Sequence, residues 1–144
     1  MMTHYDDELK NHLNTLLLNN IVQISDTVDE LILDIESEYH IGFNGIDWTS
    51  HKYIDMVIFS ENLIEKQRTI DIFLKKIKKN YPDLLNEKVN VFGDSLTNLN
   101  YQMPFKYFIE NSNLFFNLPQ HTYIWFPQSK LCINSTFEGE IYFG

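Results

Sequence analysis

The sequence has little of what would tie it to a membrane or to an oxidising compartment. Its single cysteine, Cys132, cannot form a disulfide within the chain. No apolar run approaches the roughly 18 residues that a membrane-spanning helix needs. The first residues, MMTHYDDELKNHL, carry acids where a secretory signal has basic and then apolar residues. No repeat, low-complexity tract or Gly/Ser linker interrupts the 144 residues, so we expect one cytoplasmic domain spanning 1–144.

Positive charge is scarce in the first part of the chain. Residues 1–60 hold eleven acids and two bases, residues 61–80 three acids and six bases, and residues 81–144 six acids and three bases, which gives the net charge of −9. A negative field of this kind repels phosphate backbones and anionic lipid headgroups. Nucleic acid and membranes are therefore disfavoured as main partners, and a basic partner is favoured.

Hydrophobic periodicity predicts helices early in the chain and strands late. The predicted helices span residues 4–19, from 27 to a stop at Gly42 and Gly45, and 61–80. The predicted strands span residues 53–60, 88–93 and 105–110. After residue 121, turns at Pro127-Gln128-Ser129 and Glu138-Gly139 indicate a three-stranded antiparallel meander. We therefore predict an α+β fold, with N-terminal helices packed on an antiparallel sheet that ends in a C-terminal β-meander.

The helix that begins near Thr27 contains most of the acids of interest. Thr27 and Glu30 match a capping-box pattern, and Gly42 and Gly45 mark the end of the helix. The apolar residues that share one helix face are Val28, Leu31, Ile32, Ile35 and Tyr39. The carboxylates that fall largely off this buried face are Asp29, Glu30, Asp34, Glu36 and Glu38. Solvent keeps such carboxylates ionised, so we do not expect them to act as a general acid–base pair.

Residues 91–98, VFGDSLTN, resemble the first block of GDSL-type ester hydrolases. In that family the serine after a strand is the nucleophile, which implies Ser95 here, with the Gly93 amide available for an oxyanion hole. The chain departs from the family pattern, because it has no downstream Gly-x-Asn-Asp, and Leu118 stands where the family has an aspartate three residues before the histidine, here His121. Glycine, aspartate and serine are also turn formers, so a turn after a strand is the favoured interpretation.

Metal and thiol chemistry have little support in the sequence. His4, Glu8 and His12 lie at i, i+4 and i+8 on one predicted helix. A histidine-carboxylate site, however, normally brackets its ligands within one turn and takes a third from elsewhere. Cys132 lies in the middle of a predicted strand, where we expect an inert and buried thiol. We predict no metal site and no cofactor.

Two interpretations of the acidic helix face remain open. A charged outer face can serve solubility alone. Like charges at i, i+4 destabilise a helix by about 0.2–0.5 kcal/mol per pair, however, and no lysine is interleaved to relieve them. A basic partner would explain the cluster, because charge of this kind steers association and sets specificity. Asp47 and Trp48 extend the candidate surface, and Tyr39, Phe43 and Tyr53 are nearby aromatic residues whose simpler role is in the core.

The C-terminal segment HTYIWFPQSKLCINSTFEGEIYFG is similar to the aromatic strand, acidic turn and closing strand common at the ends of bacterial toxin immunity proteins, including those of contact-dependent growth inhibition. The resemblance implies a protein that performs no reaction and neutralises a cognate basic toxin domain. A nuclease is the expected target, because its substrate cleft must be basic. The alternatives are a GDSL-like ester hydrolase using Ser95 and a generic protein-interaction adaptor. The residues expected at the partner contact are Asp29, Glu30, Asp34, Glu36, Glu38, Asp47 and Trp48.

Overall fold

The computed structural model describes residues 2–42 and 45–144, so Phe43, considered above as an aromatic neighbour, lies outside the described residues. The helices are α1 (His4–His12), α2 (Asn14–Leu18), α3 (Val28–Glu36), α4 (Leu63–Asn80), α5 (Phe105–Glu110) and α6 (Ser112–Phe116), with a 3₁₀ helix, η1 (Pro82–Asn86). The strands are β1 (Gln23–Ser25), β2 (Ile41–Gly42), β3 (Gly45–Ile46), β4 (Asp55–Ile58), β5 (Lys88–Gly93), β6 (Asn100–Pro104), β7 (Thr122–Phe126), β8 (Leu131–Ser135) and β9 (Glu140–Phe143).

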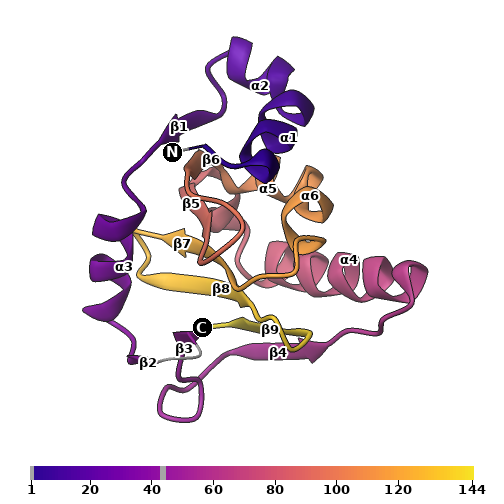
Figure 1. Ribbon diagram of the computed structural model, residues 1–144. Helices are drawn as coiled ribbons and strands as arrows, with labels where there is room; N and C mark the ends of the chain where they lie inside the picture. Colours follow the sequence, from indigo (N-terminus) through magenta and orange to yellow (C-terminus); the bar gives the residue numbers. More distant parts are fainter. Residues whose placement is uncertain (1, 43–44) are drawn as a thin grey trace.

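One seven-stranded antiparallel sheet organises the molecule, in the strand order β1-β6-β5-β7-β8-β9-β4, and β2 and β3 form a separate pair. Helix α3 lies on one side of this sheet and α4 on the other (Figure 1). The predicted α+β class is confirmed, and so is the meander, which is β7-β8-β9. Its second turn contains Gly139 at φ +89°, a backbone conformation that glycine adopts without strain.

Strand β7 shows how the sheet divides the interior into two apolar cores. All five residues of this strand are buried. Ile124 and Phe126 belong to a first core that also holds the inward residues of α1, α4, α5 and α6. Tyr123 and Trp125 belong to a second, smaller core under α3. A strand covered on both faces has a continuous apolar sequence, which is why TYIWF gave so clear a strand signal.

Helix α4 confirms the helix predicted over residues 61–80. Asn62 Oδ1 accepts hydrogen bonds from the backbone N–H groups of Ile64 and Glu65 and thereby caps the first turn. Although α4 is 18 residues long, it is amphipathic, and no helix among the described residues is long and apolar enough to cross a membrane. The inward residues of α4, each at most 2% exposed, are Ile70, Phe73, Leu74 and Ile77.

Residues 105–110 form a helix, α5, so the strand predicted there is wrong. Phe105 and Phe108 lie three residues apart and both have 0% exposure, as on the inward face of a helix. Pro104 precedes them with φ −59° and ends β6, the strand that the sequence pattern did not reveal. The aromatic composition of FKYFIE favours a strand, whereas the spacing of its two phenylalanines agrees with the helix that forms.

Other element boundaries are close to the predicted ones. The helix predicted over residues 4–19 is two helices, α1 and α2, which meet at Leu13. Leu13 is 1% exposed in the first core, so the apolar spacing that suggested one helix does describe the buried face. The strand predicted over 88–93 is confirmed as β5. The strand predicted over 53–60 forms as β4 but is shorter, covering only Asp55–Ile58.

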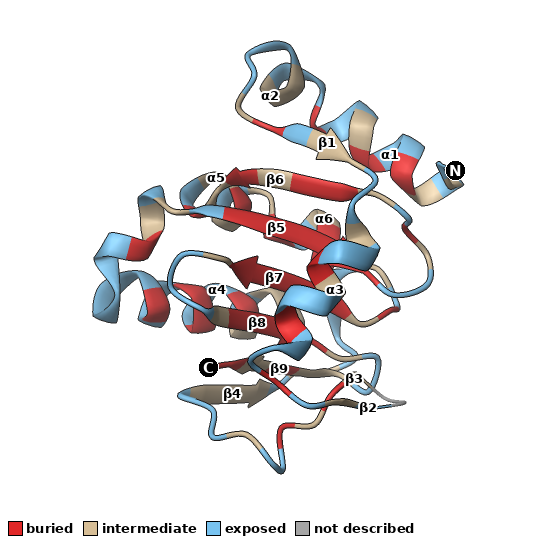
Figure 2. Cartoon of the chain, turned by 90° about the vertical axis from the view of Figure 1, so that its left-hand side faces the viewer, coloured by how far each residue is buried: buried red, intermediate tan, exposed pale blue. Residues whose placement is uncertain are grey.

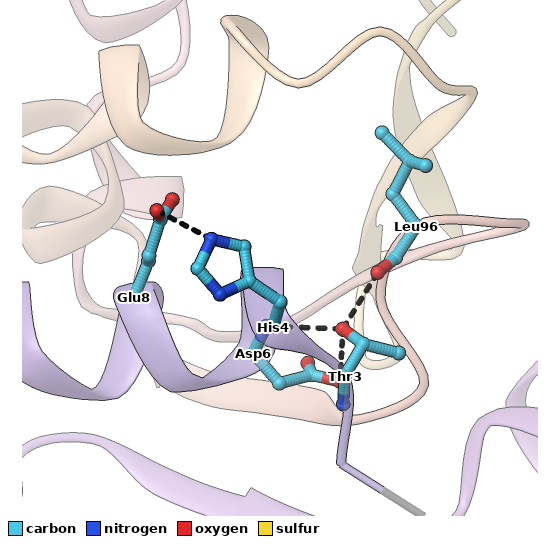
Figure 3. A network of polar contacts seen from close by, with 5 residues as sticks. All are labelled: Thr3, His4, Asp6, Glu8 and Leu96. Carbon is cyan, nitrogen blue, oxygen red and sulfur yellow. Dashed lines mark hydrogen bonds and ion pairs between the residues drawn. The ribbon is translucent and has the colours of Figure 1, made fainter.

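The first turn of α1 is fixed to the sheet through a buried carboxylate, Asp6. Thr3 and Asp6 form a capping box, and Thr3 Oγ1 donates to the Leu96 carbonyl at 2.7 Å (Figure 3). Asp6 also accepts from the Tyr101 hydroxyl at Oδ1 and from the Asn98 backbone N–H at Oδ2. Burial raises the pKa of Asp6, but these hydrogen bonds together outweigh it and hold the pKa below its usual value.

Candidate partner-binding face

The outward face of α3 is acidic. Leu31 and Ile35 turn inward, with 9% and 0% exposure, and pack in the second core. The opposite side of the helix faces solvent in front of the sheet (Figure 2). The expectation that the carboxylates lie off the buried face is confirmed, since all of them are exposed: Asp29, Glu30, Asp34, Glu36 and Glu38.

The two ends of α3 differ from the predicted ones. No side-chain hydrogen bond caps the first turn, so the capping box of Thr27 and Glu30 is wrong. Thr27 has φ −93° and ψ 25°, whereas an N-cap residue needs extended backbone. Its hydroxyl pairs instead with Ser25 Oγ at 2.9 Å. At the other end the helix stops at Glu36, before the glycines that were expected to end it.

Among residues 2–42 and 45–144, no ion pair involves a carboxylate of α3. Residues 11–51 contain no lysine or arginine. The two ion pairs among the described residues lie within α1 and between α4 and β4. Glu30 and Asp34 are four residues apart on α3, and a like-charge pair at this spacing costs about 0.2–0.5 kcal/mol. The lysine-rich helix α4 lies on the other side of the sheet (Figure 1). On the side of α3, the Nζ of Lys130 lies 5.9 Å from the centroid of the Trp125 ring.

A cleft of about 380 Å³ lies between the β3 segment and the β8–β9 hairpin. Three carboxylates line it, those of Asp47, Glu138 and Glu140, and its described lining contains no lysine or arginine. Trp48 and Tyr142 also line it, with their rings stacked at 5.1 Å between centroids and 8° between planes. We call this site, defined by these five residues, the acidic cleft. Carboxylates beside aromatic rings suit an arginine or lysine side chain.

Asp47 is held in place by its own loop. Its Oδ1 accepts from the Thr49 backbone N–H at 3.0 Å and from the Thr49 hydroxyl at 2.5 Å. The backbone N–H of Asp47 donates to the His40 carbonyl at 2.8 Å, which ties the loop to the residues that follow α3. The hydrogen bonds from Thr49 hold the pKa of Asp47 below its usual value. The carboxylate is therefore charged at neutral pH and already oriented before any partner arrives.

Trp48 is a core residue that forms the base of the acidic cleft. It is 7% exposed, and its Nε1 donates to Asn134 Oδ1 at 3.0 Å. Tyr39, which is also buried, packs edge-on against it with ring centroids 5.6 Å apart. Tyr53 is more exposed and contacts the edge of Tyr142 at 5.4 Å between centroids. Trp48 therefore offers part of a fixed ring surface to a partner.

Sequence reasoning did not include Glu138, Glu140 and Tyr142 among the partner residues. Glu138 was assigned only to a hairpin turn and Tyr142 to the strand IYFG after it, and Glu140, between the two, was given no role. Alternation along β9 places Glu140 and Tyr142 on the same face. The β3 segment, from a distant part of the sequence, then meets this face. The acid-glycine-acid pattern beside a strand was the available signal, but nothing local to it shows which segment lies opposite.

The GDSL-like segment folds around Gln120. Gln120 Oε1 accepts from three consecutive backbone N–H groups, those of Ser95, Leu96 and Thr97, at 3.3, 2.8 and 3.3 Å. The side chain of Gln120 is 3% exposed, and a Cβ added at Gly93 would lie 2.0 Å from its Nε2. The amides of Ser95, Leu96 and Thr97 thus already donate to the protein's own side chain. A side chain larger than that of glycine at position 93 would force the Gln120 amide to move.

The metal and thiol candidates are also placed by the structure. His4 and Glu8 form an exposed ion pair at 2.9 Å on α1 (Figure 3). Over residues 2–42 and 45–144, no group of three or more His, Cys, Asp or Glu side chains is arranged to hold a metal ion. Cys132 is fully buried, and burial raises the pKa of its thiol, so the thiol stays protonated.

The chain matches no known family model, no curated protein and no solved structure. Its function is therefore inferred from the chemistry of its own surface, where the outward face of α3 and the acidic cleft are the candidate sites.

Proposed function

We propose that this chain is an immunity-type inhibitor that acts in the cytoplasm of the producing cell and neutralises a cognate basic toxin domain, with a nuclease as the expected target. The observation that supports the proposal is a mainly acidic surface at α3 and the acidic cleft. The five exposed acids of α3 and the segment after it are joined by three carboxylates around an aromatic cleft. A nuclease must attract phosphates to its substrate surface. Carboxylates can take the place of those phosphates and block the surface.

The two candidate sites have different roles in the proposed mechanism. The outward face of α3 gives long-range attraction, which speeds the encounter and weakens as salt rises. The acidic cleft gives a defined contact, in which a lysine or arginine of the toxin meets Asp47 and Glu140 beside the rings of Trp48 and Tyr142. A cation over an aromatic face contributes about 0.5–1 kcal/mol at an exposed site, and a hydrogen bond to a charged group about 1.5–3 kcal/mol.

Capture from the cells that encode the protein tests the proposal. We would compare the wild type with Asp34→Lys/Glu38→Lys and with a control, Asp83→Lys/Glu110→Lys, which makes the same charge change at exposed positions outside α3 and the acidic cleft. We expect the wild type and the control to capture a basic protein whose nuclease activity is suppressed in the complex. The α3 variant should capture it about tenfold less well, and added salt should weaken capture by all three.

Two results would overturn this proposal. Equal capture by the α3 variant and the control would show that the acidic face is a solvated surface only. Capture of a basic protein that has no toxic activity would identify a protein-interaction adaptor in place of an inhibitor.

Substitution of Ser95 separates the inhibitor from the ester hydrolase. The amide of Ser95 already donates to Gln120, and we expect Ser95→Ala to capture the basic partner as well as the wild type does. We expect neither protein to hydrolyse p-nitrophenyl acetate above the uncatalysed rate. Turnover by the wild type that is lost in Ser95→Ala would identify the hydrolase instead.

A further inference from the structure

The outward face of α4 carries large apolar side chains that the described part of the chain leaves uncovered. Leu63, Ile64 and Ile72 are 73%, 79% and 60% exposed. They line a shallow groove along the helix. Ile64 and Ile72 lie on the side of α4 away from its four core residues, and Leu63 is at the N-terminal end of the groove. Apolar residues scattered singly over a surface need no explanation, whereas neighbouring exposed ones can form a contact surface.

Charges on the same face change sign along the helix. Glu65, Arg68, Ile72 and Lys75 follow each other at spacings of three, four and three residues, which keeps them on one side of a helix. Asp71 lies beside them and, like the other three charged residues, is exposed. Glu65 is thus in the first turn of α4 and Lys75 in its last third. Between them lie one base, Arg68, and one acid, Asp71.

These charges are complementary to their own reversed order. The midpoint between Glu65 and Lys75 falls at residue 70, and the midpoint between Arg68 and Asp71 falls half a residue before it. If a second α4 lies antiparallel about this point, each Glu65 faces a Lys75 and each Arg68 faces an Asp71. Both copies make the same contacts, as a two-fold axis requires. A parallel arrangement would instead place each charge opposite its own copy.

We propose that two copies of this chain associate through α4, packed antiparallel about a two-fold axis near residue 70. At this contact the two Ile72 side chains lie near the axis, and Ile64 packs on the aliphatic part of Lys75 from the other copy. In a single copy Asp71 accepts a hydrogen bond from Gln67 at 2.9 Å, which orients the carboxylate without neutralising it. The dimer is independent of the proposed inhibitor function, because α3 and the acidic cleft lie across the sheet from α4 (Figure 2).

One helix on another is a small contact. Specific interfaces bury about 1,200–2,000 Å² in total, and a single helix pair falls at or below the lower end of this range. We therefore expect a dimer that dissociates on dilution and that salt weakens, since its specificity comes from exposed charges.

Sedimentation of the full chain over a range of concentrations tests the dimer. We expect a monomer–dimer equilibrium for the wild type and no dimer for Ile72→Glu. Glu65→Lys alone and Lys75→Glu alone should each raise the dimer dissociation constant about tenfold, because symmetry makes every reversal act twice. The double variant Glu65→Lys/Lys75→Glu should restore it to within about threefold of the wild type.

Leu18→Glu is the matched control, since Leu18 is 75% exposed but lies on α2, and it should dimerise as the wild type does. A wild type that sediments as a monomer up to its solubility limit would overturn the proposal and assign the face to a different partner. Failure of the double variant to recover dimerisation would overturn the antiparallel arrangement.

Discussion

The hydroxyl of Tyr101 donates to Asp6 Oδ1 at 2.6 Å and so joins β6 to the first turn of α1. Both residues are buried, at 1% and 0% exposure. Burial and the nearby Asp6 carboxylate raise the pKa of Tyr101, which keeps the phenol protonated as a donor. The other donors to Asp6 are the backbone N–H groups of Thr3 and Asn98. A buried carboxylate needs such a complete set of donors, because an unpaired charge is costly to bury.

Replacing Asp6 should destabilise the protein more than any other substitution of an acid in α1. Asp6→Ala leaves the Tyr101 hydroxyl and two backbone N–H groups without their acceptor, and we expect the free energy of unfolding to fall by about 2–4 kcal/mol. Urea denaturation of Asp6→Ala beside Asp7→Ala measures the difference. Asp7 is exposed, so its replacement should change stability by less than about 0.5 kcal/mol. Equal effects of the two substitutions would contradict the network.

Asp6 should also contribute to the pH dependence of stability. Its pKa in the folded protein lies below the ordinary value of 3.8, so the unfolded chain binds the proton more readily. The stabilisation is therefore complete above the unfolded pKa and is lost as the pH falls through the lower, folded pKa. Unfolding free energies of the wild type and Asp6→Asn, measured between pH 7 and pH 2, should differ by a constant amount above about pH 5 and converge in acid. If the stability difference between the wild type and Asp6→Asn grew as the pH fell, the pKa of Asp6 in the folded protein would lie above 3.8, which would contradict the prediction.

Gly93→Ala should be destabilising although the added group is a single methyl. The new Cβ would lie 2.0–2.4 Å from three side-chain atoms of Gln120, so Gln120 must move and three backbone N–H groups lose their shared acceptor. We expect a loss of about 2–3 kcal/mol in unfolding free energy. Gly42→Ala is the control, because a Cβ there meets no atom of residues 2–41 or 45–144 within 4 Å, its chain neighbours aside. Thermal denaturation that ranks the two variants equally would refute the role given to Gln120.

The two aromatic residues of the acidic cleft should respond differently to substitution. Trp48→Phe removes the donor to Asn134 inside the core, and we expect it to cost about 1–2 kcal/mol of stability. Tyr142 is only partly buried. Its change to Leu removes the ring that stacks on Trp48, and we expect it to cost about 0.5–1.5 kcal/mol of stability. It should also weaken capture of the basic partner by about tenfold. Stability is followed by urea denaturation and binding by the capture assay. Unchanged capture by Tyr142→Leu would remove the cleft from the contact surface.

The parts of the fold that were predicted correctly are those with a strong local signal. Helix α4 has a cap at Asn62, a periodic apolar face and a stop at Pro82, all within one stretch of sequence. The C-terminal meander has alternating or continuous apolar strands separated by turn residues. The FKYFIE segment misled because its composition favours a strand while its phenylalanine spacing fits a helix, and the adjoining strand β6 determines which one forms.

The candidate site also has one part that local sequence patterns predict and one part that they do not. Exposure of the α3 acids follows from helical periodicity, so the sequence was sufficient for it. The acidic cleft depends on the meeting of two distant segments, and nothing near Asp47 in the sequence points to Glu138 or Glu140. The same is true of the Gln120 side chain, whose three amide contacts lie more than twenty residues earlier in the chain.

Strand β4 has one neighbour in the sheet, β9, and Ile58 pairs there with Glu140. Pairing of strands so far apart in the chain requires closure of a long loop, which slows folding. We expect β4 to join last, and pulse-labelled hydrogen exchange should show its amides gaining protection after those of β5 and β7. Asp47 and Trp48 lie in the segment between β3 and β4, so we expect the cleft to be assembled at that step. A newly synthesised or partly unfolded molecule would then lack the acidic cleft. We therefore expect only the fully folded protein to bind a partner through this site.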